Sequence, residues 1–299
     1  MNKKITFFFN EHNKNNIGEL KKNIPNYIET CQKQNQCKNC VYDYKIEQSK
    51  FKTVFKAKKT QEILQNENYG KFVLLDQYGF KEIDEDIFLN LVKSPRTDFI
   101  FFISSSFIKR FQQHEHTKKH IDTKKLNFDE SQPKECHRII AQYFKSLIPT
   151  DQEYYLHHFT IQKENKGNYY GLIFGTNHTF GMEKFLKVCW SKDSFSGQSN
   201  CNIDNDFEEG TLFYKKSSSH KIASVKEEIK NAILSGEICD NISGFKYTMQ
   251  KGCEPSLFTK VVKSLVSKEK IKRYGEVNNS STNVHRVKRY TIKVCRNEK

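Results

Sequence analysis

Polar side chains stand directly after apolar runs that are predicted as buried strands. Glu11 and Asp76 follow the runs 5–9 and 72–75, and Ser104 follows a third run. In an open α/β sheet, ligands bind beyond the carboxyl ends of the parallel strands, so these side chains are expected to share a cleft. A carboxylate after an early strand suits a pair of ribose hydroxyls, which predicts a nucleoside-containing cofactor at Glu11.

The segment Asp76-Gln77-Tyr78-Gly79 offers a second chemistry at the same sheet edge. It could present a carboxylate, an amide and an aromatic face to a substrate base, so Asp76, Gln77 and Tyr78 are the predicted catalytic residues. Polar residues also commonly cap strands, and that alternative accounts for any one of these residues taken alone.

These side chains would be positioned by a larger α/β domain at residues 1–215. The apolar runs 72–76 and 98–103 flank a helical pattern at 87–92, which predicts a βαβ unit. Residues 154–161 and 169–174 are predicted as a hairpin, and the charged, histidine-rich stretch 112–134 as a loop.

Basic charge is concentrated in the predicted second domain, residues 221–299. This segment holds 17 Lys and Arg against 8 Asp and Glu, a net charge of +9 out of +15 for the whole chain. The patterns predict a helix at 224–234 with Ser224 as its N-cap, a strand at 245–249, a helix at 254–267, and strands at 270–274 and 285–294. This order is typical of a winged helix-turn-helix domain.

Polar and basic side chains of the second predicted helix lie beside its apolar stripe, where they could face phosphates, and further cations lie on the last predicted strand. The predicted nucleic-acid-binding residues are Ser256, Thr259, Lys260, Lys263, Arg286, Lys288 and Arg289, with Lys293 beside them. The expected partner is DNA. Small winged helices also mediate protein contacts, and this alternative stays open.

The cysteines predict neither a disulfide framework nor a metal site. Nine cysteines are scattered through the chain, and the cluster Cys31, Cys37 and Cys40 lacks a fourth zinc ligand at a suitable spacing. A metal-dependent nuclease using Asp76 and the histidines of 114–120 is a third alternative. No apolar run is long enough for a signal peptide or a membrane span, so a cytoplasmic location is expected.

The runs FFFNEHN, LLDQYGF, FIFFISSSFIKRF and YYGLIFGTNHTFGMEKFLKVCW, followed by the basic C-terminal domain, resemble the three-Cys-motif partner protein family (TcmP) over nearly the whole chain. The resemblance implies a Rossmann-type, S-adenosylmethionine-dependent methyltransferase-like sheet with a winged helix, in a protein of bacteria and their mobile elements. It also implies an operon-linked protein partner. It would place Glu11 at the cofactor ribose and Asp76 to Tyr78 on the substrate side.

The chain departs from the family pattern at two places. Gln77 stands where methyltransferases more usually have a proline, and no glycine-rich turn precedes Glu11, so the sheet is expected to be incomplete at its N-terminal side. The leading hypothesis is a methyltransferase-like protein that acts on or near nucleic acid. The alternative is a non-enzymatic DNA-binding or regulatory protein on a degenerate Rossmann scaffold.

Overall fold

The protein has an α/β fold with two compact units. The computed structural model describes residues 5–34, 42–76, 82–104, 136–162, 169–201, 219–275 and 285–295. The units are Met1–Asn66 and Glu67–Lys299. The domain boundary predicted between residues 215 and 221 therefore falls inside the second unit. In the described part of the chain, no helix is both long enough and apolar enough to cross a membrane.

The first unit is built around a pair of parallel strands. Its elements are β1 (Ile5–Asn10), α1 (Lys14–Gln34), β2 (Tyr42–Glu47), α2 (Phe51–Lys56) and α3 (Lys58–Gln65). β1 pairs with β2 over its whole length. The predicted strand at 5–9 is confirmed. β2 was not predicted, because the lysine-rich run around it has no clear apolar period.

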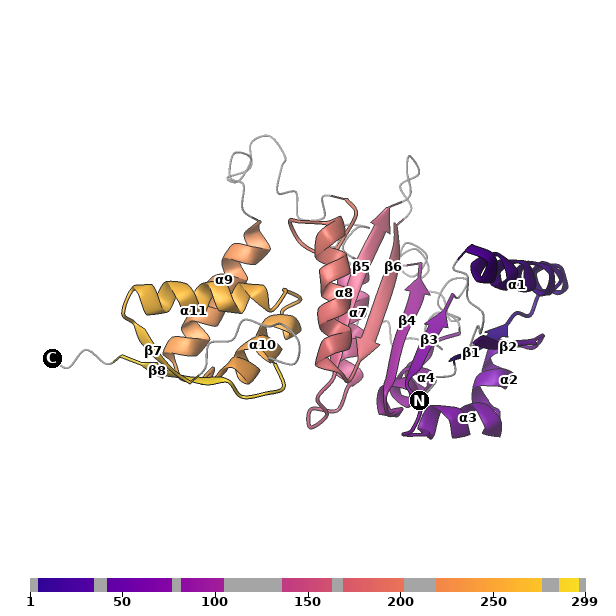
Figure 1. Ribbon diagram of the computed structural model, residues 1–299, viewed down its shortest axis with the longest axis horizontal. Helices are drawn as coiled ribbons and strands as arrows, with labels where there is room; N and C mark the ends of the chain where they lie inside the picture. The colour runs from indigo at the N-terminus through magenta and orange to yellow at the C-terminus, as the bar shows by residue number, and fades with distance from the viewer. Residues whose placement is uncertain are drawn as a thin grey trace, which may run out of the picture. The chain divides into compact units, whose positions relative to one another are not determined.

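The second unit begins with a four-stranded mixed sheet in the order β3, β4, β6, β5 (Figure 1). Its strands are β3 (Lys71–Leu75), β4 (Thr97–Ile103), β5 (Tyr155–Gln162) and β6 (Tyr169–Thr176), and its helices are α4 (Glu85–Lys93), α7 (Cys136–Leu147) and α8 (Thr179–Lys192). β3 and β4 are parallel and joined through α4, while β6 is antiparallel to both β4 and β5. The predicted βαβ unit and hairpin are confirmed.

Aromatic side chains fill the space between this sheet and its helices. Phe101 of β4 meets Phe144 of α7 edge to face, with ring centroids 5.2 Å apart, and the ring of Phe88 from α4 lies 4.8 Å from that of Phe144. On the opposite face, Phe174 of β6 stacks on Phe185 of α8 at 4.4 Å. Alternation along β4 and β6 therefore buries the sheet between α4 and α7 on one side and α8 on the other.

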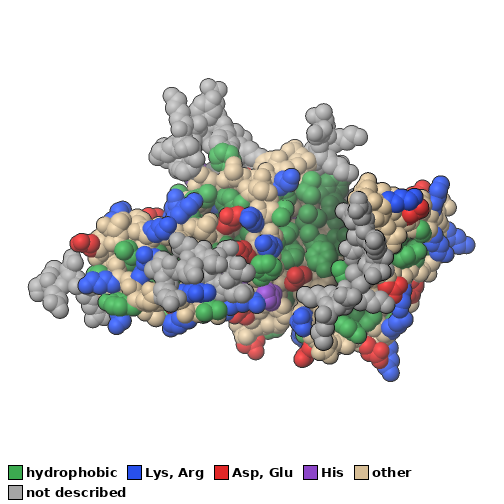
Figure 2. Space-filling view, viewed as in Figure 1, with side chains coloured by type: hydrophobic (Ala, Val, Ile, Leu, Met, Phe, Trp, Pro, Cys, Tyr) green, Lys and Arg blue, Asp and Glu red, His purple; other side chains and the backbone are tan. Residues whose placement is uncertain are grey.

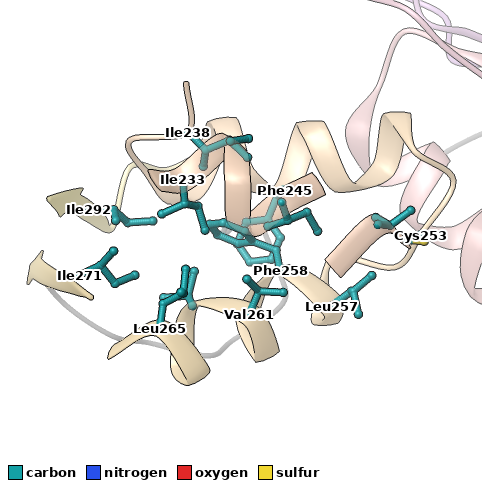
Figure 3. Packing of buried hydrophobic residues seen from close by; sticks show 14 of the residues in the cluster. Ile233, Ile238, Phe245, Cys253, Leu257, Phe258, Val261, Leu265, Ile271 and Ile292 are labelled. Atoms are coloured by element: carbon teal, nitrogen blue, oxygen red, sulfur yellow. The ribbon is translucent and has the colours of Figure 1, made fainter. Parts of the chain in front are cut away.

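The described residues of the C-terminal part of the second unit form three helices and a two-stranded hairpin. They are α9 (His220–Leu234), α10 (Asn241–Gln250), α11 (Ser256–Ser267), β7 (Ile271–Gly275) and β8 (Tyr290–Val294). Figure 3 shows apolar side chains from all these elements, such as Ile233, Phe258 and Ile292, pointing into one core. The amide of Ile292 also donates to the Cys239 carbonyl at 2.7 Å, so β8 has a second backbone partner beside β7.

Two local predictions for this part are wrong. Residues 245–249 lie within α10 rather than in a strand, because Asp240 accepts from the Ser243 amide at 2.8 Å in a capping box that starts a helix. The helix then buries Phe245, Thr248 and Met249 at helical spacing. The N-cap of α9 is Ser219, not Ser224, since the Ser219 hydroxyl accepts from the Ile222 amide at 3.0 Å.

The C-terminal helices contact the sheet part of the same unit through polar bonds. The indole Nε1 of Trp190, near the end of α8, donates to the Gly252 carbonyl at 3.1 Å. Lys246 of α10 forms an ion pair with Glu153 at 2.6 Å. Gly252 has a φ of +69°, and a Cβ there would lie 2.6 Å from the His157 ring, so this turn requires a glycine.

Candidate nucleic-acid interface

One face of α11 is free to meet a partner because the other is fully used in packing. Leu257, Phe258, Val261, Val262 and Leu265 are buried in the C-terminal core. The helical repeat then turns Ser256, Lys260 and Lys263 toward solvent, where all three are exposed, and leaves Thr259 half-buried. The structure thus brings all four predicted α11 residues to one side of the helix or its margin.

The hairpin that follows α11 adds cations next to it, since α11 contacts β7. Lys272 of β7 and Lys293 of β8 are directly opposite each other, and both are exposed. The Lys293 ammonium lies 5.4 Å from the centroid of the exposed Tyr274 ring. Figure 2 shows Lys and Arg side chains distributed over this part of the second unit.

The three remaining predicted residues lie outside the strand on which they were expected. β8 begins at Tyr290, so Arg286, Lys288 and Arg289 precede it. Arg286 donates to Nδ1 of His178, the N-cap of α8, at 2.7 Å. Burial, and then the Arg286 guanidinium, lower the pKa of His178, which keeps its ring neutral and able to accept this bond.

Lys288 and Arg289 are also held by the protein itself. Lys288 Nζ lies 3.4 Å from Asp240, the N-cap of α10. The buried Asn241 side chain accepts from the Arg289 amide and donates to the Val287 carbonyl, each at 2.8 Å. These bonds fix the approach to β8 against the start of α10, while the side chains of Arg286 and Lys288 remain exposed and that of Arg289 is half-buried.

Lys272 belongs to this surface but was not singled out from the sequence. The signal was present, because residues 270–274 were predicted as a strand and alternation across it turns Lys272 to the opposite side from the buried Ile271. Arg273 is half-buried, with its guanidinium 5.8 Å from the Tyr290 ring centroid. The pairing of Lys272 with Lys293 depends on a register that the sequence does not specify.

The carboxylates at the strand ends are divided between the two compact units. Glu11 belongs to the first unit, where it accepts from the Asn13 amide at 2.7 Å and from the Asn16 side chain at 3.3 Å. The first of these bonds is the main reason that the pKa of Glu11 is lowered. Asp76 follows β3 in the second unit and is exposed. Gln77 and Tyr78 lie outside the described residues.

Few of the metal-site candidates can be located. Cys31 is on α1, whereas Cys37, Cys40 and the histidines of 114–120 lie outside the described residues. Within the described ranges, no three His, Cys, Asp or Glu side chains come together in a way that could hold a metal ion.

No family model, curated protein or solved structure matches this chain.

Proposed function

We propose that this protein binds duplex DNA through α11 and the β7–β8 hairpin, in the manner of a winged helix. Support comes from the order of three helices and a hairpin, with the residues at Cys239 and Asp240 bonded to β8. An α-helix fits the major groove of B-DNA, whereas the deep, narrow major groove of A-form RNA excludes it. The exposed helix α11 therefore favours duplex DNA over duplex RNA as the partner.

One observation carries the proposal: within the described residues, the exposed cations of this surface have no acidic partners. Among the described side chains, no carboxylate lies within ion-pair distance of Lys260, Lys263, Lys272 or Lys293. By contrast, Lys230, Lys246 and Lys251, elsewhere in the C-terminal part, each pair with a glutamate at 2.6 or 2.7 Å. Unpaired lysines on the solvent face of a rigid helix are suited to bind phosphates.

The test is duplex binding by the full chain in a gel-shift or filter assay. Replacing Lys260 and Lys263 by Ala is expected to weaken binding by about tenfold per lysine, the cost of losing a charge-assisted hydrogen bond. Lys226→Ala removes an exposed lysine of α9 and is the matched control, expected to bind like the unmodified chain. Absence of duplex binding at low salt, or preference for duplex RNA, would contradict the proposal.

A second candidate function, methyl transfer, is favoured by the parallel β3–α4–β4 unit with Asp76 exposed at its carboxyl end. There Asp76 could orient an acceptor or take its proton. S-adenosylmethionine would supply the methyl group. Of the residues predicted to bind it, Glu11 already uses both carboxylate oxygens at the start of α1, where it accepts from Asn13 and Asn16. Calorimetric titration of the chain with S-adenosylmethionine tests this function, and absence of binding heat would count against it.

A further inference from the structure

The exposed side of α11 contains only short hydroxyl side chains and lysines. Ser256, Lys260, Lys263, Ser264 and Ser267 are its exposed residues. Arginine, asparagine and glutamine carry planar pairs of hydrogen-bonding atoms that match base edges, and α11 contains none of them. Lysine is a point charge with rotatable donors, so it binds a phosphate oxygen without the geometric demands of base recognition.

The hairpin presents a second feature of the same kind. Lys272 and Lys293 face each other directly on neighbouring strands. Two like charges in such positions repel each other and destabilise a sheet. A bound anion would relieve the repulsion between them. The exposed Tyr274 lies against Lys293 on the same outer face, where its ring limits the directions that the ammonium group can take.

We propose that this interface binds the phosphate backbone of duplex DNA with little discrimination of base sequence, and that Lys272 and Lys293 form a phosphate-binding pair beside α11. The inference rests on the proposed function and deepens it. If both elements contact phosphates, different duplexes should bind with similar affinity. The affinity should also fall steeply as the salt concentration rises, because the release of counterions from the DNA then contributes less to the binding free energy.

The first arm of the experiment is selection from a pool of random duplexes with the full chain, followed by affinity measurements on two duplexes of equal length and unrelated sequence. The expected result is no enriched consensus and affinities within a few-fold of each other. An enriched motif bound about 100-fold better than the unrelated duplex would overturn this inference and leave the proposed function standing. No binding of any duplex would overturn the proposed function itself.

The second arm is a salt series with the double variant Lys272→Ala and Lys293→Ala. The slope of the logarithm of affinity against the logarithm of salt concentration is expected to fall by about 2, since each phosphate contact contributes about 0.9. Lys226→Ala should keep the full slope. The double variant Lys272→Arg and Lys293→Arg keeps both charges, so it should also keep the full slope. Comparison with the alanine variant separates a loss of charge from a folding defect. An unchanged slope in a folded alanine variant would overturn the assignment of the lysine pair.

Discussion

Three histidine rings are buried around β5, and their surroundings keep them neutral. His157 Nε2 lies 3.1 Å from the Gly197 carbonyl and His137 Nε2 lies 3.3 Å from the Ile103 carbonyl, while His158 Nε2 has no hydrogen-bond partner among the described residues. Burial lowers the pKa of His137 to about 4 and that of His157 to about 3, and it also lowers the pKa of His158.

Acid should therefore destabilise the fold before most carboxylates titrate. The folded pKa values lie below the unfolded value of 6.5, so the unfolded chain binds more protons as pH falls. The contribution of the neutral histidines to the free energy of unfolding is fully present above pH 6.5. Below that pH it falls by about 1.4 kcal/mol per pH unit for each histidine. Urea unfolding at a series of pH values between about 7.5 and 5 measures this slope. His157→Gln should reduce it by roughly one third if the three rings contribute equally, and a flat profile would contradict the prediction.

At this same scale, the sequence predicted the exposure of the α11 residues better than the positions of the cations before β8. Lys260 and Lys263 could be predicted because the helical period alone sets which side chains face solvent. The positions of Arg286 and Lys288 depend on His178 and Asp240, which are distant in the chain. Contacts of that kind arise only when the elements pack together, so spacing cannot show them.

Among the elements, α10 shows how a cap can prevail over an apolar alternation. Residues 245–249 alternate as a strand would, yet the reciprocal bonds between Asp240 and Ser243 start a helix whose apolar side packs into the C-terminal core. The capping pair is visible in the sequence, but Asp240 is separated from the alternating run by four residues, so the run taken alone predicts a strand. Strand prediction by period alone failed for this reason.

Loss of this cap has a measurable cost. Asp240→Ala is expected to lower the free energy of unfolding by about 0.5–2 kcal/mol, because it leaves the Ser243 amide without its acceptor. Asp240→Asn keeps a side-chain oxygen for the cap and should cost less. Chemical denaturation of the two variants provides the comparison. Equal stability of the alanine variant and the unmodified chain would show that the cap contributes nothing.

The β3 strand has an unusual exposure for such an apolar sequence. Phe72 is 64% exposed and Leu74 is 65% exposed, and in the described sheet β3 pairs with β4 alone. Figure 2 shows a further apolar area over the sheet. On β4 and β6, the side chains of Ile100, Phe102 and Leu172 are only partly buried. Apolar edge strands can pair with other chains, so β3 is a candidate site of self-association.

Leu74→Lys should reduce that association while leaving the fold intact. A charge on an edge strand opposes pairing with another strand, and the exposed position requires no repacking. Light scattering over a concentration series is the measurement. Val188→Lys alters an apolar side chain of α8 that is 58% exposed and serves as the control. If both substitutions change the association equally, net charge rather than the β3 edge is responsible.

For the whole molecule, the sequence predicted the α/β class, the βαβ unit and the β5–β6 hairpin, because each depends on local periods and turns. Residues 221–299 were expected to form a second domain, and their described elements lie in the same compact unit as the sheet, to which Trp190 and Lys246 bond them. Compactness depends on long-range contacts, which composition and charge do not reveal.

Trp190 is the only tryptophan in the chain, and its indole lies where α8 meets the turn after α10. The Lys221 ammonium is 5.4 Å from the ring, and the indole N–H is bonded to Gly252. Indole emission shifts in wavelength and intensity with hydration and nearby charge. The chain therefore carries an intrinsic fluorophore at the junction of the sheet and the proposed DNA-binding part, and its emission spectrum reports on that junction without an added label.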